Sequence, residues 1–183
     1  MSDSRAQLIA KLGAVAVSLL VASVVTWEGY SARVTRDPIG RLQVCYGHDD
    51  QSLTLGQAFS PAECRAILDA DLLVHADVMN CIAEPLRAEM SDGMKAALVS
   101  LAYNVGVSRT CASTFVKRIN AGDGVAACEE LSKWVYAGGK DCRIRVNNCF
   151  GIVKRRAYER QMCEAELRIA ATPAASTAER QKE

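Results

Sequence analysis

Apolar positions are concentrated near the start of the chain, where residues 8–25 read LIAKLGAVAVSLLVASVV with Lys11 as the single charged residue. As one helix, these 18 residues would rise about 27 Å, close to the ~30 Å apolar thickness of a bilayer. Lys11 lies near the N-terminal end, where its ammonium group can reach the membrane surface. The pattern predicts an N-terminal membrane helix, which we assign to residues 1–26.

This membrane helix would be a weak one because many of its residues are small and contribute little transfer free energy. Three interpretations are open: a cleavable signal peptide with VAS at residues 21–23 as its small-x-small site, a permanent anchor, or an anchor that later leaves the bilayer. The small-residue bias fits the releasable anchor best. The small residues are Ala10, Gly13, Ala14, Ala16, Ser18, Ala22 and Ser23.

A short β region is predicted over residues 37–56. In residues 40–47, GRLQVCYG, a glycine at each end marks turns around a strand or hairpin. Leu53 and Leu55 alternate with polar neighbours, which predicts one more small strand. A small β lobe therefore follows the membrane helix.

The rest of the chain has the periodicity of helices. Ser60, Pro61 and Glu63 supply an N-cap, a first-turn proline and a capping box. Further helices are predicted from Ser91, after Ser113, over residues 125–136 and after Asn148. Residues 171–183 are small and polar and predict a disordered tail. The predicted fold class is α+β, with a mainly helical lobe and a small β lobe in one domain over residues 27–170.

The cysteines indicate disulfides. Eight are present, all from residue 45 onward, and an even number in an exported chain is typical of disulfide bonding. Buried free thiols in a reducing compartment are the alternative. If one helix joined Cys64 and Cys81, they would lie roughly 25 Å apart and out of disulfide reach. A bond between Cys142 and Cys149 is locally feasible.

Composition and spacing argue against several partners. A net charge of +1 and an aromatic content of 5% leave no basic footprint, so no nucleic-acid partner is expected. Cys45 and His48 have a spacing typical of metal ligands, but no second pair completes a four-ligand set. We therefore expect neither a metal nor a cofactor.

Two carboxylates suggest a chemistry. Glu28 follows the apolar segment closely, and Asp37 comes nine positions later. Two acids flanking a cleft suit glycosidic bond cleavage, in which one protonates the leaving oxygen and the other stays charged to activate water. Glu28, beside Trp27 and the apolar helix, is placed to donate the proton. The alternative is a pair of solvated loop acids, because acids at this spacing occur in most proteins.

Wider motifs favour the catalytic interpretation. Glu28-Gly29, Asp37 and residues 44–48 (VCYGH) resemble the active-site opening of the phage-type lysozymes, glycoside hydrolase family 24. The resemblance extends over roughly residues 27–165 and implies a lysozyme-like fold. The small-residue segment before Glu28 resembles the signal-anchor-release endolysins of lambda-like phages. The later matching blocks are residues 96–123, residues 133–140 (KWVYAGGK) and residues 147–163.

The resemblance implies roles for three positions. Glu28 would be the general acid, and Asp37 would hold and polarise a water on the opposite face of the sugar, giving inversion. The family's third residue is a threonine that helps hold this water, and here Gln43 stands in its place. Its amide can donate and accept hydrogen bonds, but it is longer. Either activity is retained with altered geometry, or the chain is a catalytically weakened, membrane-tethered peptidoglycan-binding protein.

Other polar residues have two interpretations each. His48 and Asn104 are candidate substrate-binding residues, and a structural role in the hairpin is equally open for His48. Lys154, Arg155 and Arg156 either attract anionic peptidoglycan or form a solvated helix face.

The resemblance also implies a function: hydrolysis of the β-1,4 bond between N-acetylmuramic acid and N-acetylglucosamine in peptidoglycan, for host cell lysis. The chain would be held in the host inner membrane on its periplasmic side, inactive because Glu28 is fixed at the lipid, and would then be released to the periplasm. Release would depend on a holin-type pore protein, since the anchor has no cysteine with which to start disulfide exchange. A monomer is expected.

Overall fold

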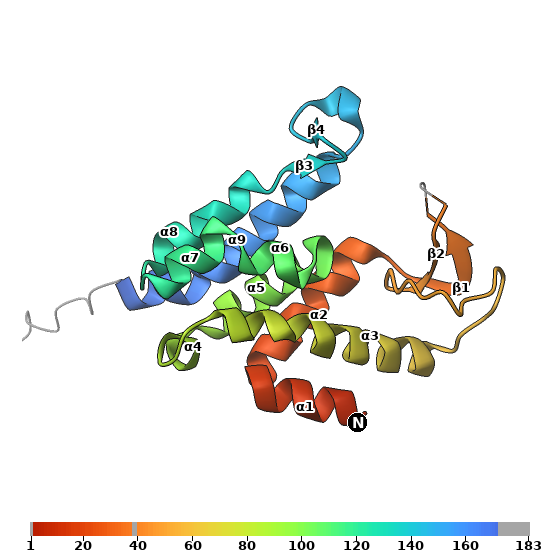
Figure 1. Cartoon of the computed structure of the whole chain (residues 1–183), viewed down its shortest axis with the longest axis horizontal. Helices are drawn as coiled ribbons and strands as arrows, with labels where there is room; N and C mark the ends of the chain where they lie inside the picture. Colours follow the sequence, from red (N-terminus) through yellow and green to blue (C-terminus); the bar gives the residue numbers. More distant parts are fainter. Residues whose placement is uncertain (1, 38–39, 172–183) are drawn as a thin grey trace, which may run out of the picture.

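The computed structural model describes residues 2–37 and 40–171, and the side chains up to residue 167. The described chain is mainly helical with two small antiparallel sheets, which confirms the predicted α+β class (Figure 1). The α-helices and strands are α1 (Asp3–Leu12), α2 (Ala14–Glu28), β1 (Ser31–Arg36), β2 (Leu42–Cys45), α3 (Pro61–His75), α4 (Leu86–Glu89), α5 (Asp92–Val105), α6 (Val107–Cys111), α7 (Thr114–Asn120), α8 (Gly124–Glu130), β3 (Tyr136–Ala137), β4 (Lys140–Asp141) and α9 (Phe150–Ala171). Single 3₁₀ segments follow α3 (Ala76–Cys81), α8 (Leu131–Lys133) and β4 (Arg145–Asn147).

The core is built around α5, which packs against both α2 and α9. Its N-terminus is capped by Ser91, whose hydroxyl accepts the backbone N–H of Met94. The buried face of α5 includes small residues such as Ala96, Ala97 and Ala102, so neighbouring helices can approach it closely. The predicted starts of α3, α5, α7 and α9 are all confirmed.

The apolar N-terminal segment does not form the single helix expected over residues 8–25. It bends by 114° between α1 and α2, at Gly13, whose φ of 93° is a conformation that favours glycine. Both helices are buried against the lobe through Leu8, Leu12, Ala16, Val17, Leu20 and Val24. Within the described residues no one helix is long and apolar enough to cross a membrane; the bent pair α1 and α2 meets that requirement together, by length and composition. The assignment of residues 1–26 to an anchor stays a prediction.

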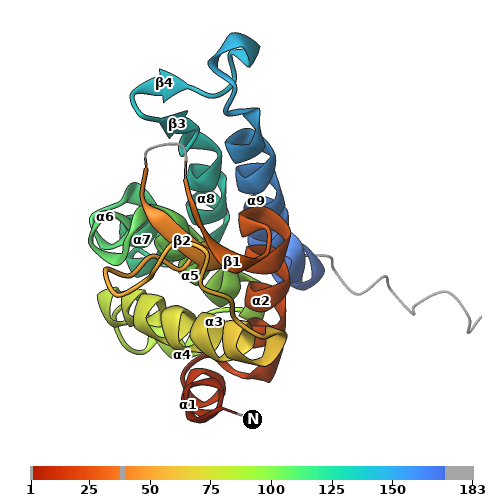
Figure 2. The same ribbon diagram turned by 90° about the vertical axis from the view of Figure 1, so that its right-hand side faces the viewer.

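The β lobe is an antiparallel hairpin that follows α2 directly (Figure 2). β1 begins at Ser31, six residues before the predicted start at residue 37. The strand predicted around Leu53 and Leu55 is wrong, since neither residue lies in a strand. The chain pairs with β1 only just after them, where Gly56 donates to the backbone oxygen of Val34 and Ala58 bridges to Arg33. Alternating polarity over so few residues does not by itself identify which of them form a strand.

The C-terminal part differs from prediction at one helix end. The α-helix expected over residues 125–136 ends at Glu130, and a 3₁₀ segment at Leu131–Lys133 and then the small β3–β4 hairpin follow it. α9 then runs back across the lobe (Figure 1).

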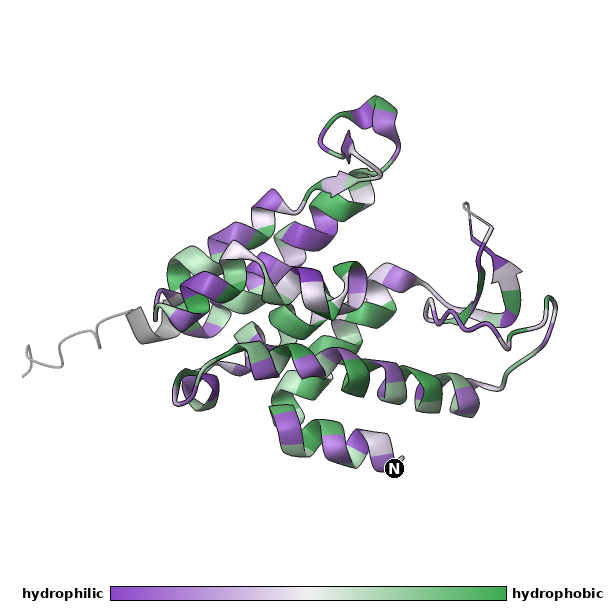
Figure 3. Cartoon of the chain, in the orientation of Figure 1, coloured by the Kyte–Doolittle hydropathy of each residue, from purple (hydrophilic) through white to green (hydrophobic). Residues whose placement is uncertain are grey.

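Figure 3 shows polar and apolar residues alternating around α3, as expected for a helix with one buried face. The predicted disordered tail lies, from residue 172 on, outside the described residues.

All eight cysteines are paired, which confirms the disulfide prediction and excludes the free-thiol alternative. The local bond Cys142–Cys149 is present as expected, and Cys64 and Cys81 bond to other partners. The four disulfides are Cys45–Cys64, Cys81–Cys111, Cys128–Cys163 and Cys142–Cys149.

Candidate active site

Glu28 is the last residue of α2, and Gly29, with φ of 73°, turns the chain out of the helix. The Glu28 carboxylate is partly exposed, with 21% of the side chain accessible. Its Oε1 accepts a hydrogen bond of 2.5 Å from Nη1 of Arg155 on α9. A cavity of about 300 Å³ opens beside this pair and is lined by Trp27, Glu28, Asn104, Asn148, Cys149, Gly151, Ile152 and Arg155.

Arg155 is held in place by further hydrogen bonds. Its Nε donates to Glu159 Oε1 at 3.0 Å, and its Nη2 donates to the backbone oxygen of Ser100 at 3.3 Å. Arg156 donates to the other Glu159 oxygen and to Asn104 Oδ1. Burial lowers the pKa of the Arg156 guanidinium, and Glu159 opposes that effect. Two arginines and two glutamates therefore form a charge-balanced network beneath the cavity.

The solvated helix face, one of the two sequence interpretations, is wrong for Arg155 and Arg156. Both are buried, at 4% and 1% exposure, whereas Lys154 is exposed. Attraction of anionic peptidoglycan by these residues stays a prediction. The available signal was their spacing. Glu159 follows Arg155 by four positions on one helix, which puts the two side chains on the same face. The sequence did not lead us to predict the roles of Ser100 and Glu159 in this network or the burial of both arginines.

Gly47 of the β lobe lies next to Glu28. A Cβ added to Gly47 would lie 3.5 Å from Glu28 Oε2. Gly47 also has φ of 85°, a conformation that favours glycine, whereas the 3.5 Å separation is an ordinary van der Waals contact. The adjacent Tyr46 is fixed to the helical lobe, because its backbone oxygen accepts a 2.9 Å hydrogen bond from the Tyr103 hydroxyl. Glu28 therefore has Oε2 beside the hairpin at Gly47 and Oε1 on Arg155.

Asp37 and Gln43 both lie on the hairpin. Asp37 follows β1, and its Oδ1 accepts the backbone N–H of Arg41 at 2.8 Å, which links the end of β1 to the residue before β2. Residues 38 and 39 lie outside the described part of the chain. Gln43 pairs with Thr35 across the strands. The proposed acid is thus on α2, and its two proposed companions are on the β1–β2 hairpin.

His48 has a protein partner. Its Nδ1 lies 2.9 Å from Asp71 Oδ2 on α3, so it connects the hairpin loop to the helical lobe. Burial raises the pKa of the Asp71 carboxyl, and His48 opposes this. Asn104, besides accepting from Arg156, lines the cavity beside Glu28. Contact of His48 or Asn104 with substrate stays a prediction.

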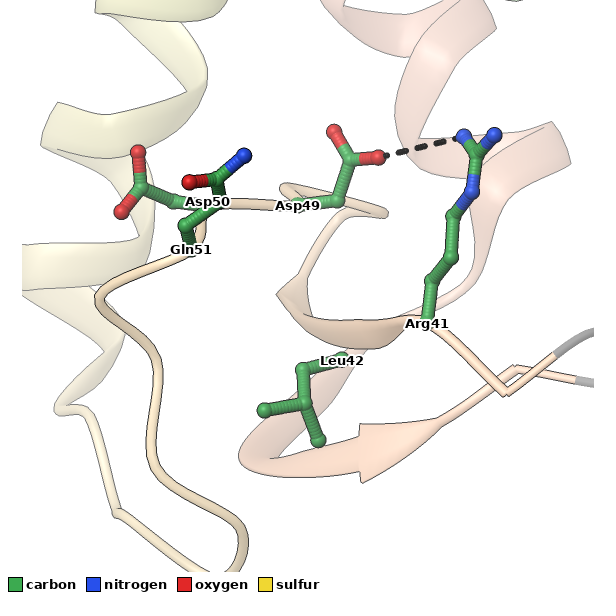
Figure 4. A pocket seen from close by; sticks show the side chains of 5 residues that line it. All are labelled: Arg41, Leu42, Asp49, Asp50 and Gln51. Carbon is green, nitrogen blue, oxygen red and sulfur yellow. Dashed lines mark ion pairs between the residues drawn. The ribbon is translucent and has the colours of Figure 1, made fainter.

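A second cavity, of about 450 Å³, lies on the β side. Figure 4 shows Arg41 and Asp49 at its edge, paired at 3.6 Å, with Asp50 and Gln51 further along the loop. Leu42 supplies its apolar side chain. Among the described residues there is no group of three or more His, Cys, Asp or Glu side chains placed to hold a metal ion.

The chain matches the family model described as phage lysozyme over residues 25–159. A curated relative is the SAR-endolysin of Enterobacteria phage P21, which is 38% identical over 136 residues, covering 74% of this chain and 76% of the relative.

Solved structures show the same fold. The active form of the P1 phage endolysin Lyz superposes with a TM-score of 0.68 at 20% identity, over 87% of this chain and 94% of that one. The secreted inactive form of the same P1 endolysin gives 0.50 at 20% identity, over 85% and 97%.

Proposed function

The chain belongs to the phage lysozyme family; it is a phage endolysin with lysozyme activity, and on that premise we propose how it acts and how it is controlled. It cleaves the β-1,4 bond between N-acetylmuramic acid and N-acetylglucosamine in peptidoglycan, and it is inactive while its N-terminal segment remains in the membrane. The observation that carries this proposal is the position of Glu28 at the end of α2, which packs one face on the helical lobe, where Glu28 is bonded to Arg155 in a cavity.

The proposed chemistry is acid catalysis with inversion. Glu28, when protonated, gives its proton to the leaving oxygen. Asp37 on the hairpin holds a water at the other face of the sugar, and the Gln43 amide orients that water. Attack from this face inverts the anomeric centre, as expected when two carboxyl groups leave room for a water between them. Arg155 fixes the Glu28 carboxylate, and Asn104 lies at the cavity wall to contact the sugar.

The proposed off-switch is mechanical. Placement of a catalytic group within about an ångström matters for rate, and Glu28 belongs to the same helix as the apolar residues of α2. When α2 is in lipid, Glu28 is kept at the membrane surface and away from Arg155. When α2 packs on α5, Glu28 reaches its ion-pair partner. The greater similarity of this fold to the active P1 form than to the inactive one supports the interpretation of the packed state as the working state.

We place the tethered protein in the inner membrane, facing the periplasm, and the released protein in the periplasm as a monomer. Four disulfides suit that oxidising compartment. The first cysteine is Cys45, outside the anchor, so a holin-type pore that collapses the membrane potential is the proposed trigger.

The test compares lysis of outer-membrane-permeabilised cells by purified soluble protein. Wild type should clear the suspension. Glu28→Gln should slow clearing by about 100-fold or more, because general acid catalysis contributes on that scale. The control Glu89→Gln, at an exposed position, should match wild type. Equal lysis by Glu28→Gln and wild type would remove Glu28 from the proposed role, and a product released in the β configuration would exclude inversion.

Gln43 motivates a second candidate function, that of a weakened membrane-tethered peptidoglycan binder. Wild type and Gln43→Thr should be compared for lysis and for sedimentation with sacculi. Lysis by wild type within about tenfold of Gln43→Thr supports the enzyme. Binding without lysis by wild type, with lysis restored in Gln43→Thr, favours the binder.

A further inference from the structure

We propose that Ser23, in the middle of the anchor helix, is a positioning residue for the active site: its hydroxyl, delivered when α2 packs on α5, completes a buried hydrogen-bond relay through Ser100, Glu159 and Arg155 to Glu28. The inference rests on the proposed function and deepens it, since it assigns the group through which docking of the anchor reaches the catalytic carboxylate.

The first links of the relay are two serines from different helices. Ser23 Oγ lies 3.2 Å from Ser100 Oγ, and Ser100 Oγ donates to Glu159 Oε1 at 2.7 Å. All three residues have no exposed surface. A hydroxyl carries one hydrogen, and that of Ser100 is directed to the carboxylate. Ser23 is therefore the donor of the serine–serine bond.

The next links return to α2. Glu159 Oε1 accepts both Ser100 Oγ and Arg155 Nε, and Arg155 Nη1 donates to Glu28. The Arg155 Nη2 atom also donates to the backbone oxygen of Ser100. Ser100 thus contacts the relay at two points, through its hydroxyl on Glu159 and through its backbone oxygen on Arg155. The position of Ser100 therefore influences the position of the Arg155 guanidinium. The relay begins and ends on one helix, five positions apart, at Ser23 and Glu28.

The Ser23 hydroxyl affects the relay because it is buried. A polar group without a partner in the protein interior costs more than one in water, and charged networks in a low dielectric are sensitive to each missing bond. In lipid, Ser23 can satisfy its hydroxyl with a carbonyl of its own helix. In that state Ser100 lacks the Ser23 donor. Docking of α2 supplies it together with Glu28, so the relay is complete only in the packed form.

Ser23 differs in this respect from the other hydroxyls of α2. Ser18 donates to the backbone oxygen of Ala14 at 2.9 Å, and Thr26 donates to that of Ala22 at 2.7 Å. Both are exposed and bonded within their own helix. Ser18 therefore offers a matched control, because its replacement by alanine makes the same chemical change in the same helix without touching the relay.

The experiment uses the purified, soluble full chain with isolated peptidoglycan sacculi. The kcat and KM are measured for wild type, Ser23→Ala, Ser18→Ala, Ser100→Ala and the double variant Ser23→Ala/Ser100→Ala, with melting curves for each. Loss of one hydrogen bond predicts a fall in kcat of about 3- to 10-fold for Ser23→Ala, with KM changed less than about twofold. Ser18→Ala should keep the wild-type kcat. In the Ser100→Ala background, Ser23→Ala should add less than about a twofold loss, because the bond is already gone.

Three results would overturn the inference: an unchanged kcat for Ser23→Ala with only a lower melting temperature, a full additional loss in the Ser100→Ala background, or an equal loss for Ser18→Ala. Failure of the proposed function itself appears differently. In that case wild type leaves the sacculi intact, or Glu28→Gln digests them as fast as wild type does.

Discussion

Glu28 and Arg155 lie 127 positions apart in the chain and form an ion pair of 2.5 Å between the end of α2 and the buried face of α9. The pair connects the N-terminal apolar segment to the last helix, across the cavity that both residues line. Arg155 therefore binds two carboxylates, those of Glu28 and Glu159, through one guanidinium group.

We predict that Arg155→Met is strongly destabilising. The substitution leaves Glu159 buried with only Arg156 to compensate it, and removing one partner of a buried pair costs about 3–5 kcal/mol. Urea denaturation of the soluble protein measures the loss in free energy of unfolding. The control Lys154→Met changes the exposed neighbour and should cost less than about 0.5 kcal/mol. Similar costs for the two variants would argue against a structural role for the network.

We predict that Gly13→Ala shifts the protein toward the membrane. Alanine disfavours φ of 93° by about 1–2 kcal/mol, and it favours a continuous helix by about 1 kcal/mol. Together these effects should lower the ratio of soluble to membrane-bound protein by roughly 30-fold or more, measured by fractionation of cells.

Gly106→Ala is the matched control for this hinge. Gly106 has φ of 92° but ends α5, outside the bend between α1 and α2, and an added Cβ there meets open space. It should lower the unfolding stability without changing membrane partition. A soluble Gly13→Ala protein, or an equal shift for Gly106→Ala, would contradict the hinge.

We predict a pH-dependent effect for Asp71→Asn. Burial raises the pKa of the Asp71 carboxyl above its ordinary 3.8, so the native state binds more protons than the unfolded state between the two values. Wild-type stability from this group therefore falls as pH rises through that window. The free energy of unfolding of Asp71→Asn, relative to wild type, should rise from pH 3 to pH 5.5 in urea titrations.

Asp50→Asn should show the opposite slope. Hydrogen bonds from Ser52 lower the pKa of the Asp50 carboxyl, so its contribution is present above the ordinary value and is lost as pH falls through the native one. The relative stability of this variant should therefore fall as pH rises. Equal slopes for Asp71→Asn and Asp50→Asn would contradict the assignment.

We predict that two of the disulfides contribute different amounts to the free energy of unfolding. Cys128 and Cys163 are 35 positions apart, whereas Cys142 and Cys149 are only seven apart. Closing the longer loop restricts the unfolded chain more, so replacing the first pair by serines should cost about 1 kcal/mol more than replacing the second. Denaturant unfolding checks the order. Loss of the second pair should affect lysis more than stability, because Cys149 lines the Glu28 cavity.

The sequence by itself determined the features that depend on neighbours along the chain. The capping box at Ser60 and Glu63 starts α3, and an even number of cysteines in an exported chain indicates disulfides. The motif around Glu28 and residues 44–48, together with the later blocks at residues 96–123, 133–140 and 147–163, indicated the family. The capping signal extends over a few residues, within which backbone hydrogen bonds and side-chain caps operate, whereas the cysteine number is a property of the whole composition.

Only the tertiary structure decided which distant groups meet. The bond between Cys45 and Cys64 depends on how β2 meets α3. The bend at Gly13 and the inward direction of Arg155 go with the packing of α2, α5 and α9. From the sequence alone, a run of basic residues on a helix is interpreted as a solvated face. In the folded protein Arg155 is buried instead, because Glu28, 127 positions earlier in the chain, supplies a carboxylate to pair with it. The physical reason is that burial and charge compensation are set by contacts in space, and local patterns carry no information about a partner 127 residues away.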